Sequence, residues 1–200
     1  MNGFFVVGTD TGVGKTAVAR AIAASLPGRV VIFKPVVTGT DEPGPTDTER
    51  LAEIAPTVVP HHYGPAVSPH LAAELAGDHL ALRDLVGAAQ DAAAEADTIV
   101  VEGVGGLLVP LNDHDTVRDL ARELGLPLVI AARPGLGTIN HTLLTLEAAR
   151  DLQTAAVVLT PWPEDPSLME TSNRETIARM GGVRVDTLGM DALALPVEAW

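Results

Sequence analysis

A short segment near the start of the sequence has the residue types and spacing of a phosphate-binding loop. The apolar run at 4–7 leads into Gly-Thr-Asp-Thr-Gly-Val-Gly-Lys-Thr at 8–16, and an alanine-rich helical pattern follows. Glycines let backbone N–H groups point at phosphate oxygens, and a helix beginning near Lys15 directs the positive end of its dipole at them. Lys15 would reach the β- and γ-phosphates, and the Thr16 hydroxyl would bind Mg²⁺. The segment therefore predicts binding of a nucleoside triphosphate, although Thr9 stands where the usual pattern has glycine.

Two charged residues stand at the ends of apolar runs that read as buried strands. Lys34 closes the run at 30–34, and Glu102 closes the run at 98–102. The carboxyl ends of parallel strands border the ligand crevice, so both side chains should face it. We predict a catalytic or phosphate-binding role for Lys34, rather than a place on the surface. We predict that Glu102 binds metal rather than forming a structural ion pair, because a carboxylate at a buried strand end needs a cationic partner.

Asp47 is a second candidate acid, and the residues around it allow two interpretations. Thr46 and Glu49 have capping-box spacing, which places Asp47 in the first turn of a helix, where the dipole favours an acid. The alternative is a metal ligand, and the local residues favour neither interpretation. Thr38 follows the second strand in a Thr-Gly-Thr loop suited to contact with a substrate.

The elements that position these side chains alternate along the chain. Apolar runs predict strands at 4–7, 30–34, 98–102, 126–132, 155–160 and 183–188, and helical patterns lie at 17–26, 69–76, 80–96, 116–124, 138–152 and 168–180. Continuous apolar strands are buried on both faces. We therefore expect an α/β fold in three layers, a mostly parallel sheet with helices on both faces, of the P-loop NTPase type and forming a single domain over residues 1–200. Prolines make the 40–70 region loop-rich in this prediction.

Composition excludes several other classes of protein. The chain has no cysteine, so it can form neither a disulfide framework nor a thiolate zinc site, and it lacks a thiol nucleophile. Its formal charge of −13 repels nucleic acid and anionic membranes. No apolar run approaches the length of a membrane span, and we expect a soluble, cytoplasmic protein.

The six histidines do not suggest a metal site. None is paired with another at helical spacing. We expect the side chains of His61, His62, His79 and His114 to be mostly solvated, with the first two in a loop. His70 and His141 lie at predicted helix starts.

Five segments, in their order and spacing, make the chain resemble dethiobiotin synthetase, an ATP-dependent carboxylase of biotin synthesis. They are GTDTGVGKT, KPVVTGT, SPHLAAELAG, VEGVGGLLVPL and LGTINHTLLTLEA. Several of them belong to no general NTPase pattern, so the combination is more specific than the phosphate-binding loop alone. The likeness spans about residues 1–160, and the part after 160 matches poorly.

The resemblance implies a defined chemistry. 7,8-Diaminopelargonate takes up CO₂ or bicarbonate as a carbamate, the carbamate attacks the γ-phosphate of ATP, and the second amine closes the ureido ring and expels phosphate. By motif match, Lys15 and Lys34 neutralise charge between the carbamate and the γ-phosphate. Thr11, also assigned a catalytic role, and Thr38 contact the diamine or its carbamate. Mg²⁺ is assigned to Thr16, Asp47 and Glu102, which favours the metal interpretation of Asp47.

The resemblance also implies how the nucleotide is held. The expected nucleotide-binding residues are Gly12, Val13, Gly14, Lys15, Thr16, Ala17, Asp47, Glu102, Gly103, Val104, Gly105, Thr160, Pro161, Gly189, Met190 and Asp191. The family often has Asn-Asp where this chain has Thr160-Pro161. We therefore expect recognition of the base to be altered, so that ATP or another nucleoside triphosphate could serve.

A homodimer is implied as well. In the family, the start of a helix from the other subunit receives the carboxylate of the substrate. The matching segment here is Gly137, Thr138, Ile139 and Asn140, and a helix N-terminus is physically suited to a carboxylate.

Two rival functions belong to other classes. A partitioning or positioning ATPase would carry an additional lysine in its loop at the place of Asp10, and it tends to carry a basic or amphipathic surface element. An amidotransferase-type synthetase domain would need a partner domain with a cysteine nucleophile, and this chain has no cysteine.

Overall fold

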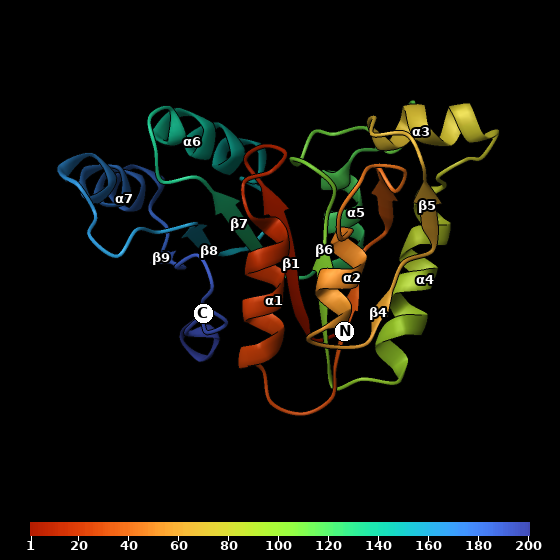
Figure 1. Cartoon of the computed structure of the whole chain (residues 1–200), viewed down its shortest axis with the longest axis horizontal. Coiled ribbons are helices and arrows are strands. Elements are labelled where there is room, and N and C mark those ends of the chain that lie inside the picture. The colour runs from red at the N-terminus through yellow and green to blue at the C-terminus, as the bar shows by residue number, and fades with distance from the viewer.

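A central sheet of seven strands organises the molecule, and all its neighbouring strands are parallel. The computed structural model describes residues 1–200, with strand order β4-β2-β6-β1-β7-β8-β9 (Figure 1). The strands are β1 (Gly3–Gly8), β2 (Val30–Phe33), β4 (Thr57–Val58), β6 (Thr98–Glu102), β7 (Leu128–Ala132), β8 (Thr154–Leu159) and β9 (Val185–Thr187). The predicted α/β class and parallel sheet are confirmed.

Helices cover both faces of this sheet, which makes the three layers that the apolar runs predict. The helices are α1 (Lys15–Ser25), α2 (Asp47–Ala52), α3 (Pro69–Ala76), α4 (Leu82–Ala94), α5 (Val117–Leu124), α6 (Thr138–Ala148) and α7 (Leu168–Gly181), followed by a 3-10 turn (Val197–Ala199). α4, α5, α6 and α7 pack against one core cluster, whereas α1, α2 and the C-terminal segment pack against the other (Figure 1). None of the helices is long and apolar enough to cross a membrane.

The strand β1 lies at the centre because its residues are apolar on both faces. Phe5 belongs to one core cluster and Val6 to the other, and both side chains are fully buried. β1 pairs with β6 on one side and β7 on the other, with Val6 opposite Glu102. The phosphate-binding loop therefore leaves the middle of the sheet, beside the carboxyl ends of its neighbours.

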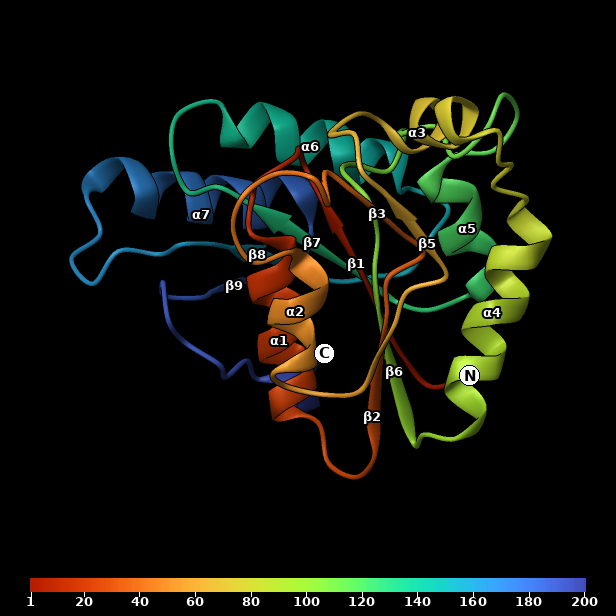
Figure 2. The same ribbon diagram turned by 45° about the vertical axis from the view of Figure 1, so that its right-hand side comes forward.

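The region from 40 to 70 is more ordered than its prolines suggest. Strand β5 (His61–Tyr63) pairs in parallel with β3 (Val36–Thr38), which precedes this region, as a separate two-stranded sheet (Figure 2). α2 and β4 also fall between residues 40 and 70. The prediction that His61 and His62 lie in a loop was wrong. Strands of three residues show no periodicity in sequence, and pairing with a distant strand decides their conformation.

Candidate active site

The loop between β1 and α1 has the backbone shape that phosphate binding requires. Gly12 and Gly14 have φ values of 67° and 97°, which other residues rarely adopt. A Cβ atom at Gly14 would lie 2.5 Å from Cγ2 of Thr160, so no larger residue fits there. The Lys15 ammonium donates to the carbonyl oxygen of Asp10 at 3.2 Å, across the loop. Burial lowers the pKa of Lys15, against the opposing effect of Glu102.

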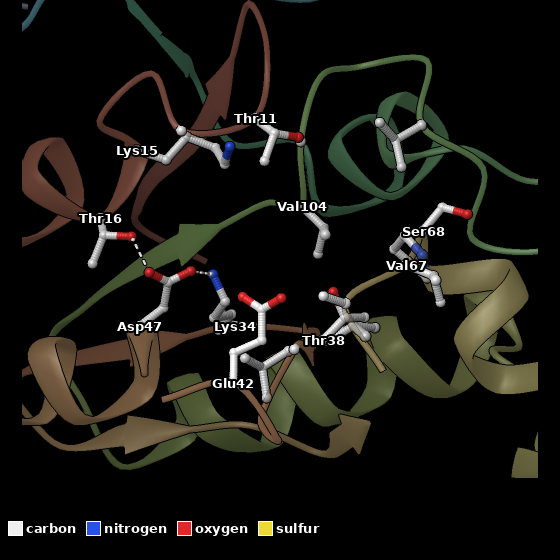
Figure 3. A pocket seen from close by; sticks show the side chains of 18 of the residues that line it. Thr11, Lys15, Thr16, Lys34, Thr38, Glu42, Asp47, Val67, Ser68 and Val104 are labelled. Atoms are coloured by element: carbon white, nitrogen blue, oxygen red, sulfur yellow. Dashed lines mark hydrogen bonds and ion pairs between the residues drawn. The ribbon is translucent and has the colours of Figure 1, made fainter. Parts of the chain in front are cut away.

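A buried charge network lies beside this loop. The Lys34 Nζ is 2.7 Å from Oε1 of Glu102. It is also 2.9 Å from Oδ2 of Asp47, a contact drawn in Figure 3. Lys34 is 3% exposed and Glu102 is fully buried. Burial by itself would lower the pKa of Lys34, but the two carboxylates outweigh it and raise the pKa. Burial likewise favours a higher pKa for Asp47, yet Lys34 and Thr16 hold that pKa below its ordinary value.

Thr16 joins the same network from the first turn of α1. Its Oγ1 lies 2.9 Å from Oε1 of Glu102 and 3.0 Å from Oδ1 of Asp47. A hydroxyl has one proton, so it can donate to only one of these oxygens at a time. The second oxygen of Glu102, Oε2, is buried and has no hydrogen-bond partner. Two carboxylates and a hydroxyl thus converge with spare acceptor capacity, as Mg²⁺ beside a triphosphate would use.

Both interpretations of Asp47 agree with its position. It is the first residue of α2, and the capping box between Thr46 and Glu49 is formed. The same helix start aims the Asp47 side chain at Thr16 and Lys34 (Figure 3). The capping box fixes where α2 begins and thereby directs the carboxylate.

A cavity of about 710 Å³ opens next to the network. Its volume falls in the range of ligand pockets. The predicted site residues that line it are Thr11, Gly12, Gly14, Lys15, Thr16, Ala17, Lys34, Thr38, Asp47, Val104 and Gly105. The structure thus brings together residues from four separate sequence segments.

Other residues that line the cavity were not predicted from the sequence. They are Val36, Val37, Glu42, Arg50, Ala66, Val67, Ser68, Pro69 and Val109, whereas Gly39 belongs to the Thr-Gly-Thr loop that was expected to contact a substrate. The segment SPHLAAELAG pointed to Ser68 and Pro69 only as part of a resemblance. Glu42 and Arg50 flank Asp47 in a charged stretch that, in sequence, looks like any solvated surface.

The residues expected near the base lie on two adjoining loops. The Trp162 N–H donates to the Leu188 carbonyl oxygen at 2.8 Å, which brings 160–162 against the loop containing Gly189. Thr160 is 2% exposed, because its side chain packs against Gly14. Pro161, Met190 and Asp191 are exposed and are the accessible members of the group.

The start of α6 lies outside the large cavity. Gly137 caps the helix in a left-handed conformation without a side-chain hydrogen bond, and His141 makes the first bond back to its carbonyl oxygen. Thr138 is 4% exposed and its Oγ1 lies 3.4 Å from that of Thr142, whereas Asn140 is exposed. The Thr138 N–H donates to the Gly135 carbonyl oxygen at 3.2 Å, so the expected carboxylate-binding segment offers the N–H groups of Ile139 and Asn140 rather than either polar group of Thr138.

The expectation that His61 is mostly solvated was also wrong. Its side chain is 23% exposed, and Nδ1 lies 3.1 Å from Oδ2 of Asp78, which also accepts from the Tyr63 hydroxyl at 2.6 Å. This cluster ties the loop after α3 to β5. The side chains of His62, His79 and His114 are exposed, as expected.

Comparison with known proteins agrees with the geometry. A family model described as an AAA domain matches residues 2–189. The ATP-dependent dethiobiotin synthetase BioD of Anaeromyxobacter dehalogenans strain 2CP-1 is 45% identical over 193 residues, covering 90% of this chain and 86% of its own. The protein of the same name from Mycobacterium sp. strain KMS is 44% identical over 197 residues, which cover 92% of this chain and 86% of that protein.

Among solved structures, a ParA family ATPase from Chlorobium tepidum TLS superposes with a TM-score of 0.59 at 15% identity, covering 95% of this chain and 85% of its own. A nucleotide-binding protein in complex with ADP from Archaeoglobus fulgidus gives a TM-score of 0.51 at 15% identity, and the superposition covers 96% of this chain and 82% of that protein. At this identity the likeness shows the fold of a P-loop NTPase.

Proposed function

The chain belongs to the dethiobiotin synthetase family and is an ATP-dependent ligase of biotin biosynthesis, and from this premise we propose the reaction that its site performs. A single domain, residues 1–200, converts 7,8-diaminopelargonate, CO₂ and ATP into dethiobiotin, ADP and phosphate. The observation that carries this proposal is a network in which Lys34, Asp47 and Thr16 line a large cavity and the fully buried Glu102 contacts Lys34 and Thr16 from behind them.

The chemistry proceeds in three steps. One amine of the substrate attacks the carbon of CO₂ and loses a proton, which gives a carbamate. A carbamate oxygen attacks the γ-phosphorus, and the bond between that phosphorus and the leaving oxygen of ADP breaks. The second amine then attacks the carbonyl carbon of the resulting carbamic-phosphoric anhydride, loses a proton and expels phosphate as the ring closes.

The two lysines supply the charge that these steps need. Negative charge gathers on the carbamate and the γ-phosphate, and fixed cations in a water-poor site stabilise it strongly. Lys34 is kept charged and in place by Glu102 and Asp47. Lys15 reaches over the phosphate-binding loop and is partly desolvated, so its charge is available to an anion. Thr11 and Thr38 line the cavity, where hydroxyl groups can hold the diamine or its carbamate.

We propose that Thr16, Asp47 and Glu102 hold Mg²⁺. The buried and unpartnered Oε2 of Glu102 supports this, because such an atom normally finds a partner. When bound, Mg²⁺ would neutralise phosphate charge and orient the γ-phosphate for in-line attack.

We further propose a homodimer in which α6 of one subunit completes the site of the other. Leu136, Leu144 and Leu108 surround the start of α6 and its neighbouring loop, and they are 88%, 61% and 66% exposed. Exposed leucines of this kind mark contact surfaces when they gather in one region. The free N–H groups at the start of α6 would receive the substrate carboxylate.

One assay tests the proposed reaction. The purified protein, given diaminopelargonate, bicarbonate and MgATP, should release phosphate and form dethiobiotin in equal amounts, identified by mass spectrometry. Omission of the diamine or of bicarbonate should stop phosphate release. ATP hydrolysis that proceeds equally well without the diamine would contradict the proposal and would favour a nucleotide-driven switch.

A further inference from the structure

Glu42 is a carboxylate on the cavity wall that the proposed chemistry does not yet use. The other acids of the site are occupied, since Asp47 and Glu102 both contact Lys34 and Thr16. Glu42 makes no ion pair and no side-chain hydrogen bond, although Lys15, Lys34 and Arg50 line the same cavity. Figure 3 shows its carboxylate directed into the pocket.

The backbone of the loop holds Glu42 in this position. Its N–H donates to the Gly39 carbonyl oxygen at 3.1 Å, which closes a tight turn directly after Thr38. Within the same turn, the N–H groups of Thr40 and Asp41 donate to Tyr63 and Gly64, each at 3.2 Å. The turn is thus fastened to the end of β5, which places the backbone of Glu42 beside the cavity and leaves its exposed side chain free to meet a ligand there.

Glu42 is an exposed residue of the cavity wall, and its free carboxylate carries a cost when a triphosphate and a carbamate bind beside it, because like charges repel. A cationic or hydrogen-bond-donating part of the ligand would remove that cost. Diaminopelargonate has such a part, since only one of its two amines is carboxylated first. The other amine carries protons until the ring closes.

We propose that Glu42 binds this second amine and thereby selects a diamine over a monoamine. The inference rests on the proposed reaction and adds a residue that recognises its substrate. An ammonium or amine N–H donates to the Glu42 carboxylate, near the Thr38 hydroxyl, while the first amine faces Lys34.

The test compares two protein variants with two ligands. Glu42→Gln keeps the size of the side chain and removes its charge, and Asp41→Asn removes a charge from the neighbouring position of the same turn, which does not line the cavity. The ligands are diaminopelargonate and the matching nine-carbon acid with a single amine at position 7 or 8. Binding of each ligand, the KM of MgATP and the melting temperature are measured for wild type and both variants.

Glu42→Gln should weaken binding of the diamine by about fivefold or more, the upper range for an exposed ion pair. Binding of the monoamine and the KM of MgATP should stay within about twofold, and Asp41→Asn should resemble wild type. Glu42→Asp should recover part of the loss.

Three results would overturn the inference. They are unchanged diamine binding in Glu42→Gln, equal weakening of both ligands, and a rise in the KM of MgATP that matches the rise for the diamine. These differ from a failure of the proposed reaction, in which the wild-type protein itself forms no dethiobiotin.

Discussion

The Lys34 ammonium and the Glu102 carboxylate form an ion pair at 2.7 Å in which both side chains are almost completely buried. Removal of one partner leaves the other buried charge without its closest counter-ion. Lys34→Met should therefore lower the free energy of unfolding by about 3–5 kcal/mol, besides abolishing activity. The double variant Lys34→Met with Glu102→Leu should recover most of that stability but no activity. Chemical denaturation measures both, and a double variant no more stable than Lys34→Met would contradict this account.

Loss of Lys15 should affect stability less than loss of Lys34, because the Lys15 ammonium contacts a backbone carbonyl oxygen and forms no ion pair. Lys15→Ala should lower kcat/KM by about 10²-fold or more, since a cation directed at the γ-phosphate stabilises charge that develops in the transition state. Its melting temperature should stay near that of wild type. Activity within about threefold of wild type would remove Lys15 from the mechanism.

Removal of Mg²⁺ should stop the reaction. Substitution of a proposed Mg²⁺ ligand should raise the Mg²⁺ concentration that the enzyme needs. EDTA should abolish product formation and excess Mg²⁺ should restore it. Asp47→Asn should raise the Mg²⁺ concentration that gives half-maximal activity by about tenfold or more. Glu53→Gln is a matched control, because Glu53 directly follows α2 but contacts Arg20 on the surface. An unchanged Mg²⁺ requirement in Asp47→Asn would exclude that residue as a ligand.

The proposed shared site can be tested by mixing two variants that are each impaired in activity. Asn140 is exposed in the first turn of α6, where an acid favours the helix itself but repels a substrate carboxylate. Asn140→Glu should therefore weaken the diamine while leaving nucleotide binding and stability intact. Mixed with Lys15→Ala, it should recover up to about a quarter of wild-type activity, because half of the dimers are mixed and each has one intact site. Absence of recovery after demonstrated subunit exchange, or a monomer in solution, would count against a shared site.

Base selectivity should be weak. Thr160 is covered by Gly14, and Pro161 has no N–H to offer, so neither provides the paired donor and acceptor that reads a base edge. A bidentate contact is worth about 1–3 kcal/mol of discrimination. Without it, ATP, CTP and GTP should support turnover with kcat/KM values within roughly tenfold of one another. An ATP preference above about a hundredfold would show that other residues recognise adenine.

The sequence predicted the elements that carry strong periodicity or a defined start. The bounds of α3 and β6 agree with prediction to the residue, because Pro69 and Gly77 delimit the helix and a polar acid ends a buried strand. Lys34 and Glu102 stand out in the sequence for the same reason, as charges at the ends of apolar runs. Glu102 forms an ion pair with Lys34, the interaction that the sequence analysis did not favour, and its binding of metal stays a prediction. The short strands β3 and β5 were not predicted from the sequence, because only pairing between distant segments stabilises them.

Individual side chains outside these patterns were harder to place. Thr160 was expected to contact the nucleotide, and its burial depends on how the end of β8 meets the phosphate-binding loop. Glu42 belongs to a charged turn whose orientation depends on hydrogen bonds to the end of β5. Such positions follow from tertiary contacts that composition and periodicity do not report.

The place of β1 in the sheet also constrains how the protein is made. β1 ends at Gly8, but its two neighbours begin at Thr98 and Leu128. A chain emerging from the ribosome thus exposes an apolar strand without partners until most of the polypeptide has been synthesised. The nucleotide-binding loop cannot reach its final form before β7 has emerged, so the nascent chain should not bind nucleotide until then.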